Sequence, residues 1–437
     1  MEILALAMFA VAIGALLVGY PVAYTLGTVA LAFGTFTLGL DFFALLPLRI
    51  WGIMTNFTLL AVPLFVFMGV VLERSGLAED LLNAMGELFG SVRGGLALSV
   101  VLVGSLLAAT TGVVGATVVT MGIIALPPML KHRYQPELAT GTVAAAGTLG
   151  QIVPPSIVLI LLGDIIGVPV GRMFMGAVIP GILLIAMFLT YIAIVSWRNS
   201  EVAPALTREH SYGMGSRLLK SMIPPLTLVV AVLGSIFFGI ASPTESAAVG
   251  SVGALALAAS RRRLNWQNLN ESMRQTTRLT SMVFLILIGA TCFGLVFRGM
   301  GGDQLVHELL TGLPGGTAGF LLVSMSLIFV LGFFLDFLEI SFIVVPILAP
   351  IASFLGLDLL WFSILIAVNL QTSFLTPPFG FSLFYLKAVA PPEIRIQHLY
   401  RGVVPFVLIQ IITIAALIAF PRIVLWLPDL MDRLQGL

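Results

Sequence analysis

Two short stretches, GQIVPPSI at residues 150–157 and QTSFLTPPFG at residues 371–380, show how the rest of the chain is organised. Both stretches contain a Pro-Pro pair inside a long apolar run. Three pairs of prolines share one offset of 223 residues: Pro127 and Pro350, Pro154 and Pro377, and Pro155 and Pro378. Several matches in one register indicate an internal repeat, in which residues 95–167 return, altered, as residues 316–391.

The composition places this repeat in a membrane protein. Of the 437 residues, 59% are hydrophobic and only 9% are charged, and the mean hydropathy is +1.11. Soluble domains carry roughly 25% charged residues, whereas the apolar runs here reach the ~20 residues that a spanning helix needs. An internal repeat in such a chain is typical of secondary transporters. The net charge of +1 gives no reason to expect a nucleic-acid partner.

The first 94 residues predict membrane helices followed by an amphipathic arm. Spans are expected at about 3–19, 22–40 and 57–72, and the charged segment 73–93 is expected to lie along the membrane interface. The first apolar run lacks a basic leading region and continues directly into the second span. We therefore expect it to be a transmembrane helix and not a cleaved signal peptide.

Basic residues set the orientation, because they are enriched in cytoplasmic loops. Two basic segments, 198–220 and 261–278, flank two predicted spans, which puts both segments on the cytoplasmic side. The loop KHR (131–133) of the first repeat then falls on the cytoplasmic side as well. Its counterpart in the second repeat, LGLD (355–358), carries no basic residue and is expected outside. Matching positions thus lie on opposite sides, so the repeat is inverted, and both termini are expected to be external.

Each repeat begins with a segment that is too short for two spans. Residues 95–128 and residues 317–350 number 34 each and begin and end on the same side, whereas two spans with a turn need about 40 residues. Each segment therefore predicts a re-entrant hairpin, with its tip at 110–117 or at 335–341. A span broken at Pro-Pro follows each hairpin. Non-helical backbone at that depth is tolerated only where protein or a cavity surrounds it.

The breaks supply the chemistry of a binding site. One half-helix ends in free carbonyls, which suit a hard cation such as Na⁺, and the next begins with free amides, which suit an anion. Small and polar residues gather there: Thr110, Thr111, Gly112, Gly115 and Thr117 with Thr148, Gly150, Gln151 and Ser156 in the first repeat, and Asp336, Glu339 and Ser341 with Asn369, Thr372, Ser373, Thr376, Gly380 and Ser382 in the second. Any one of them could simply allow close helix packing, but their repeat-matched placement favours function. Pro155 is expected in the first turn of its second half-helix.

Five further residues carry individual expectations. Carboxylates within spans are costly and usually functional, so Asp336 and Glu339 could hold a cation, carry a proton or make a structural hydrogen bond at the hairpin tip. Asp164 is expected to be solvated at an external helix end. Glu245, in the turn SPTES, is expected to cap a helix. Cys292, alone in an apolar run, predicts a packed core thiol.

Enzyme motifs are absent from the sequence. It contains no phosphate loop of the form GxxxxGK[ST], no HExxH and no convincing Ser/His/Asp constellation. We therefore do not expect an enzyme, and any uphill transport would have to draw on an ion gradient or on a partner.

The chain resembles the large membrane subunit, the DctM-like permease, of tripartite ATP-independent periplasmic (TRAP) transporters. The resemblance extends over nearly the whole length. The lines that carry it are LAVPLFVFMGVVLERSGLAEDL (60–81), GTLGQIVPPSIVLILLG (147–163), GIASPTESAAVG (239–250), NLQTSFLTPPFGFSLFYLK (369–387) and YRGVVPFVLIQ (400–410).

This resemblance implies a Na⁺-coupled importer of small organic acids in the bacterial inner membrane. It implies two protein partners, a small four-helix membrane subunit and a periplasmic substrate-binding protein, besides membrane lipids. It also implies an elevator motion, so the expected fold is an all-α polytopic inverted-repeat elevator with two re-entrant hairpins and two Pro-Pro-broken helices. The implied segments are 1–94 (scaffold helices and amphipathic arm), 95–170 (first transport repeat), 171–315 (scaffold helices and cytoplasmic loops), 316–392 (second transport repeat) and 393–437 (scaffold helix and tail).

The resemblance also assigns roles to the residues at the breaks. The first Na⁺ site is expected to comprise Thr110, Thr111, Gly112, Gly115, Thr117, Thr148, Gly150 and Ser156, and the second Asp336, Glu339, Ser341, Thr372, Thr376 and Gly380. The substrate is expected to contact Gln151, Pro154, Pro155, Asn369, Pro377 and Pro378. No metal other than Na⁺ is implied.

Three questions stay open at this level. The first tip, TTGVVGAT, differs from the Ser-Gly-Ser-like tip of many relatives, so the individual ion ligands are not fixed. The second tip resembles a subfamily labelled for mannitol or chloroaromatic compounds, but 2-oxo acids and other monocarboxylates fit equally well. The alternatives to a TRAP permease are a self-sufficient Na⁺/carboxylate carrier of similar architecture and a scaffold or channel-like subunit without coupled transport.

Overall fold

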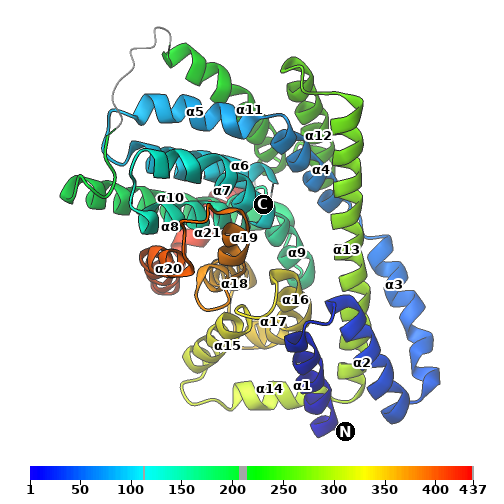
Figure 1. Cartoon of the computed structure of the whole chain (residues 1–437). Coiled ribbons are helices and arrows are strands. Elements are labelled where there is room, and N and C mark those ends of the chain that lie inside the picture. Colours follow the sequence, from blue (N-terminus) through cyan, green and yellow to red (C-terminus); the bar gives the residue numbers. More distant parts are fainter. Residues whose placement is uncertain (112–113, 206–213, 436–437) are drawn as a thin grey trace.

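The structure, a computed structural model, describes residues 1–111, 114–205 and 214–435. Within these ranges it consists of 21 α-helices and two 3₁₀-helices, with no strand (Figure 1). Among the described residues, four helices are long and apolar enough to cross a membrane, and the number rises to six if each of two bent helix pairs counts as one span. The prediction of an all-α, multi-pass membrane protein is confirmed.

The N-terminal part holds three apolar helices and two shorter ones. Its elements are α1 (Glu2–Val18), α2 (Val22–Thr37), the 3₁₀-helix η1 (Leu40–Leu45), α3 (Leu46–Met54), α4 (Ala61–Arg74) and α5 (Leu77–Phe89). The helices α1, α2 and α4 match the predicted spans, whereas α3 was not predicted. The amphipathic segment forms α5, which is bent by 56° from α4 and packs its apolar face on α6 and α11.

The two predicted repeat segments contain similar but not identical series of elements. The first consists of α6 (Gly95–Thr111), α7 (Val114–Lys131), α8 (Pro136–Thr148), η2 (Leu149–Gln151) and α9 (Ile157–Ile166). The second consists of α15 (Thr317–Leu331), α16 (Phe337–Ile343), α17 (Val345–Phe354), α18 (Leu359–Leu375) and α19 (Phe381–Val389). Each segment ends with a helix that is interrupted at Pro-Pro. Two helices precede it in the first segment, whereas three precede it in the second, because α16 and α17 are bent by 51° from each other.

The remaining helices connect and flank the two repeats. They are α10 (Val170–Arg198), α11 (Met214–Phe237), α12 (Pro243–Ser260), α13 (Trp266–Gly299), α14 (Gly302–Thr311), α20 (Ile396–Ala419) and α21 (Arg422–Gln435). Ser242 and Glu245 form the expected capping box at the start of α12, in which the Ser242 N–H donates to the Glu245 carboxylate at 2.7 Å. These bonds hold the pKa of the Glu245 carboxyl below its ordinary value. Cys292 is buried in α13, as predicted.

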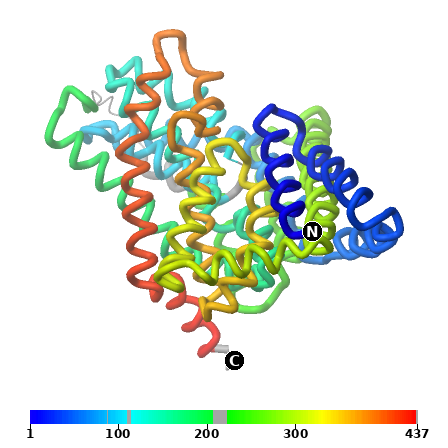
Figure 2. The backbone as a smooth tube through the Cα atoms, turned by 90° about the horizontal axis from the view of Figure 1, so that it is seen from below, coloured from blue at the N-terminus to red at the C-terminus, as the bar shows by residue number. Residues whose placement is uncertain are grey.

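The two repeats pack crosswise on each other. In the first hairpin, α7 packs on α8 of its own repeat and on α19 of the other. In the second repeat, α16 and α17 pack on α9 of the first. Figure 2 shows the N-terminal helices beside the end of α13 on one side of the molecule and α20 on the other, with α18 and α19 between them. The broken helices thus lie at the centre, where protein surrounds their non-helical backbone.

Small residues let two of these helices approach closely. A Cβ atom on Gly141 in α8 would lie 2.1 Å from the carbonyl oxygen of Gly402 in α20, which leaves no room for a side chain. Such close contacts are typical of membrane helix pairs.

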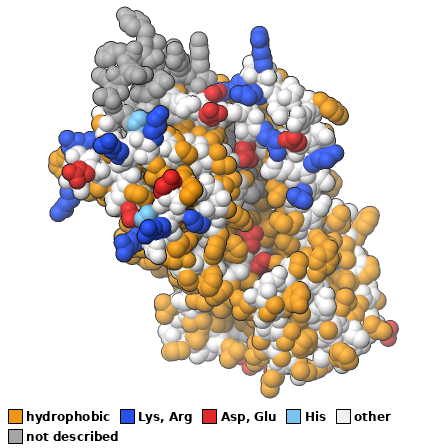
Figure 3. Space-filling view, in the orientation of Figure 1, with side chains coloured by type: hydrophobic (Ala, Val, Ile, Leu, Met, Phe, Trp, Pro, Cys, Tyr) orange, Lys and Arg blue, Asp and Glu red, His pale blue; other side chains and the backbone are white. Residues whose placement is uncertain are grey.

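Charged side chains are unevenly distributed on the molecular surface. Figure 3 shows Lys and Arg side chains gathered over the upper part of one face, whereas hydrophobic side chains dominate its lower part. This asymmetry is expected of a protein whose basic loops lie on one side of a membrane.

Candidate functional site

The first helix break lies between η2 and α9. Its central hydrogen bond runs from the Ser156 hydroxyl to the carbonyl oxygen of Gln151, at 2.9 Å. Ser156 is the N-cap of α9, which begins at Ile157. The expectation that Pro155 occupies the first turn of this half-helix was therefore wrong, because the helix begins two residues later. The Pro154–Pro155 peptide bond is cis.

At the second break, a serine hydroxyl again donates to a backbone carbonyl, and this carbonyl matches that of Gln151 in the repeat. The Ser382 hydroxyl donates to the carbonyl oxygen of Phe374 at 2.7 Å, and Phe374 follows Gln151 by the 223 residues that separate the prolines. The Pro377–Pro378 bond is also cis. A Cβ atom on Gly380 would lie 2.6 Å from the Phe374 oxygen, so the chain needs a glycine there to turn back towards that carbonyl.

Three threonines predicted as ion ligands donate their hydroxyl protons within their own helices. Thr148 donates to the Ala145 carbonyl at 2.9 Å, and Thr372 donates to the Val368 carbonyl at 2.8 Å. The Thr376 hydroxyl donates to the Thr372 carbonyl at 2.7 Å. Such bonds satisfy the proton but leave the lone pairs of the hydroxyl oxygen available. These side chains can therefore pack closely and still offer an oxygen to a cation.

Three buried polar side chains next to the breaks have no hydrogen-bond partner among the described residues. They are Gln151 in η2, Gln371 in α18 and Ser341 in α16, and none of them is exposed. Buried polar groups are normally paired, and an unpaired one costs about 1–3 kcal/mol. A polar ligand that forms hydrogen bonds with these side chains would remove this energetic cost. Gln371 was missed by the sequence reasoning, although it begins the stretch QTSFLTPPFG and directly precedes Thr372.

The two carboxylates of the second hairpin cap a helix. The N–H of Phe337 donates to Asp336 at 2.6 Å, and the N–H of Asp336 donates to Glu339 at 3.1 Å. Together they form a capping box at the start of α16. Of the three roles that the sequence left open, the structural hydrogen bond is present, and the remaining carboxylate oxygens stay available as ligands.

The tip of the first hairpin is described only in part. Gly112 lies outside the described residues, and the side chains of Thr110 and Thr111, at the end of α6, are not described. Thr117 is buried in α7. Gly115 faces α19, because a Cβ atom on it would lie 3.1 Å from the ring of Tyr385. The first hairpin thus meets the second broken helix directly.

The residues predicted to contact substrate lie in different settings. Asn369 is buried and donates its amide to the Met325 carbonyl of α15 at 2.7 Å. The Pro378 carbonyl accepts a bond from the Tyr400 hydroxyl at 2.8 Å. Pro154 and Gln151 lie at the first break. Pro154 lines a cavity between α5, α6, α10 and α11, and the described residues that line this cavity do not include Gln151, Asn369 or Pro378.

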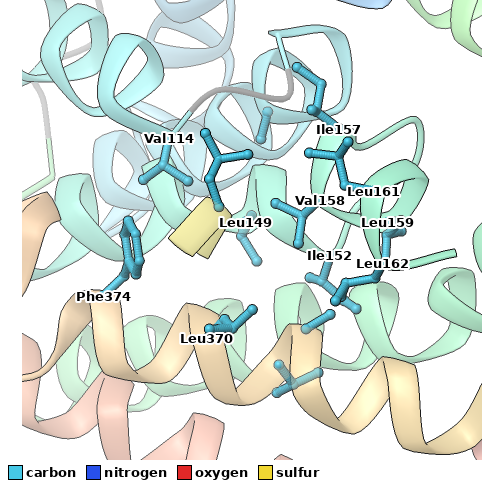
Figure 4. Close-up of a cluster of buried hydrophobic side chains, with 14 of the residues drawn as sticks. Val114, Leu149, Ile152, Ile157, Val158, Leu159, Leu161, Leu162, Leu370 and Phe374 are labelled. Carbon is cyan, nitrogen blue, oxygen red and sulfur yellow. The ribbon is translucent and has the colours of Figure 1, made fainter. Parts of the chain in front are cut away.

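Apolar packing joins the two breaks. Figure 4 shows Val114 of the first hairpin and Leu149 of η2 in one cluster with Leu370 and Phe374 of α18. All four side chains are buried. This cluster fixes the first break against the second, so that the unpartnered amides of Gln151 and Gln371 belong to one packed unit.

A side-chain hydrogen bond connects the first hairpin with α4. The Thr120 hydroxyl on α7 donates to the Glu73 carboxylate on α4 at 2.5 Å. The neighbouring Arg74 is turned the other way and pairs with Glu271 of α13.

Comparisons with known proteins agree over almost the whole chain. The family model described as "Tripartite ATP-independent periplasmic transporter, DctM component" matches residues 9–423. The chain is 32% identical to the sialic acid TRAP transporter large permease of Vibrio cholerae, over 96% of this chain and 97% of that one. It is 30% identical to the isethionate TRAP transporter permease of Oleidesulfovibrio alaskensis, over 91% of this chain and 62% of that one.

A solved structure shares the fold. The chain superimposes on the YdaH transporter of Alcanivorax borkumensis with a TM-score of 0.62, covering 88% of this chain and 90% of that one. The two are only 16% identical, so this likeness shows the fold alone. With the family model covering residues 9–423 and the large permease of Vibrio cholerae aligned over 97% of its length, the chain belongs to the DctM family of large permease components of TRAP transporters.

Proposed function

We propose that this chain is the large permease of a TRAP system that imports a small organic acid, driven by a Na⁺ gradient. A periplasmic binding protein delivers the acid, and a small four-helix membrane subunit completes the permease in the bacterial inner membrane. Both termini face the periplasm. The observation that carries the proposal is the pair of matched helix breaks, packed on each other, with the buried amides of Gln151 and Gln371 unpartnered beside them.

Relatives indicate the substrate class. Their names specify sialic acid, C4-dicarboxylates, isethionate and ectoine, all small molecules with a carboxylate or a sulfonate. We propose a substrate of the same kind here, bound near Gln151 and Asn369 and the Pro-Pro pairs. The Gln151 amide can donate two hydrogen bonds to an anionic oxygen.

Oxygen atoms at the breaks support the two Na⁺ sites. Thr148, Thr372 and Thr376 keep free lone pairs, and Ser341 is buried beside the second hairpin tip without a partner among the described residues. Hard cations bind such hydroxyl, carbonyl and carboxylate oxygens. The proposed ligand sets remain those expected from the sequence. The carbonyls of Gln151 and Phe374 are weaker candidates, because each already accepts a serine hydroxyl proton.

The crosswise packing supports an elevator motion. Segments 95–170 and 316–392 hold each other through α7 with α19 and through α16 and α17 with α9, so they are suited to move as one body. The segments 1–94, 171–315 and 393–437 would form the scaffold. Inverted repeats related in this way underlie alternating access in many secondary transporters.

Reconstitution tests the proposal. Labelled organic acids are offered to proteoliposomes that contain this chain alone, or this chain with the small subunit and the binding protein, under an inward Na⁺ gradient. The proposal predicts uptake only with all three components. Uptake by the chain alone would instead establish a self-sufficient carrier, and uptake that ignores the Na⁺ gradient would indicate a channel-like or uncoupled subunit.

A further inference from the structure

A cavity with charged side chains in its wall lies away from the helix breaks. It has a volume of about 400 Å³ and is bounded by α3 and α13 on one side and by α9, α16 and α17 on the other. In Figure 1, α13 runs along the molecule with α3 on one side and α9 and α16 on the other. Four charged side chains line it: Arg49, Asp164, Arg298 and Asp303. We name it the external cavity.

Three of the four charged side chains that line the external cavity have a hydrogen-bond or ion-pair partner, and the fourth, Arg49, has none among the described residues. Arg298 pairs with Asp303 at 3.5 Å. Asp164 is partly buried and accepts a hydrogen bond from the Asn56 amide at 2.7 Å, so its carboxylate has a protein partner that the sequence did not predict. Arg49 forms no ion pair or hydrogen bond with another described residue. One positive charge of the cavity wall is therefore uncompensated by a direct partner.

Arg49 lies on the short helix α3, LPLRIWGIM, which packs on the membrane span α13. The residue is exposed, so its guanidinium is accessible to a solute in the cavity. Ile53 follows one turn later and also lines the cavity, so this face of α3 is turned towards it.

The proposed orientation places the cavity on the periplasmic side. The helix α13 carries the basic residues Arg274 and Arg278 in its first half and ends at Gly299. If its start is cytoplasmic, Arg298 and the cavity lie at the opposite, external end. The cavity also touches both the scaffold helices and the two repeats, so a solute inside it would contact both.

We propose that the external cavity is a binding site for a small carboxylate or sulfonate, in which the Arg49 guanidinium binds the anion and Arg298 assists. A guanidinium offers a planar pair of donors that matches the oxygens of such anions. The site receives the acid on the periplasmic side before the acid reaches the helix breaks. This last role rests on the proposed import function, whereas anion binding at Arg49 does not.

A thiol reporter tests the anion site without knowledge of the substrate. Ile53→Cys is introduced in a Cys292→Ala background, and the full chain is assembled with its partners in vesicles with the periplasmic side outward. The thiol is labelled from outside with 2-sulfonatoethyl methanethiosulfonate, an anion, and with its trimethylammonium analogue, a cation. We expect Arg49→Ala to lower the ratio of anion to cation labelling rates about fivefold or more, since a single nearby charge has an effect of that order.

Two matched variants control the labelling. Arg49→Lys keeps the charge and should keep the ratio, and Arg422→Ala removes an exposed arginine elsewhere and should not change it. Arg49→Gln provides a second neutral variant if Arg49→Ala assembles poorly. The same ratio in the neutral variants as in the parent, or no labelling from outside, would overturn the anion site.

Uptake measurements separate this inference from the proposed function. In the complete system, Arg49→Ala should raise the KM for the transported acid about tenfold while leaving the maximal rate largely unchanged. An unchanged KM would refute the role of the external cavity in receiving the transported acid and would leave the proposed function standing. Failure of the wild-type system to accumulate any acid would refute the proposed function, and the labelling ratio would still decide the anion site.

Discussion

Replacing Thr120 with valine removes the one side-chain hydrogen bond described between the first hairpin and α4. Its hydroxyl donates to the Glu73 carboxylate at 2.5 Å. Hydrogen bonds to charged groups contribute about 1.5–3 kcal/mol, and the lower value applies here because both side chains are partly exposed. Since 1.4 kcal/mol corresponds to a factor of ten, Thr120→Val should shift the population away from the described arrangement about tenfold.

Distances between spin labels measure this shift. Label sites at Ile123 on α7 and Val252 on α12 are exposed, and α12 packs on α4, so the pair reports movement of the hairpin relative to the scaffold. We expect Thr120→Val to populate a second distance that is minor in the wild type. Adding Glu73→Ala should cause little further change, because the bond is already lost. Thr227→Val on α11 serves as the control, since that hydroxyl bonds only within its own helix. Identical distance distributions for wild type and Thr120→Val would refute the role of this bond.

Three further predictions address the ion sites and the packing. Ser341→Ala combined with Thr376→Ala should raise the Na⁺ concentration for half-maximal uptake several-fold, and an unchanged value would move the second ion site elsewhere. Asp336→Asn should preserve the helix cap, as asparagine also caps helices, yet weaken Na⁺-dependent uptake at least tenfold; wild-type uptake would limit this carboxylate to a structural role. Gly141→Ala should destabilise the purified protein in thermal unfolding by several kcal/mol, because its Cβ would meet a backbone oxygen of α20 at 2.1 Å. Gly14→Ala, with open space around it, should have little effect, and equal effects of the two substitutions would contradict this packing.

The sequence predicted those features that depend on local chemistry. Pro127, Pro180 and Pro405 lie inside helices, so a proline alone does not locate a break. The breaks at Pro154 and Pro377 could be located because a Pro-Pro pair recurs there at an offset of 223 residues among small and polar residues. The capping roles of Ser242 and Glu245 follow equally from a local pattern. The membrane class followed from composition.

Tertiary contacts were beyond prediction from one sequence. The helix α3 is short and contains Pro and Arg, so nothing in its pattern distinguished it from a loop. The unpartnered state of Gln371 depends on which helices surround it, and the partner of Asp164, Asn56, lies 108 residues away. The packing of α9 on the second hairpin and of α19 on the first likewise depends on the assembled fold.

The central claim is that a Na⁺ gradient drives transport through the two packed helix breaks. The most direct test uses proteoliposomes with the chain, the small subunit and the loaded binding protein, and compares an inward Na⁺ gradient with equal Na⁺ on both sides at the same membrane potential. The account predicts accumulation of the acid above its external concentration with the gradient, and only equilibration without it. Equal accumulation under both conditions would contradict the account.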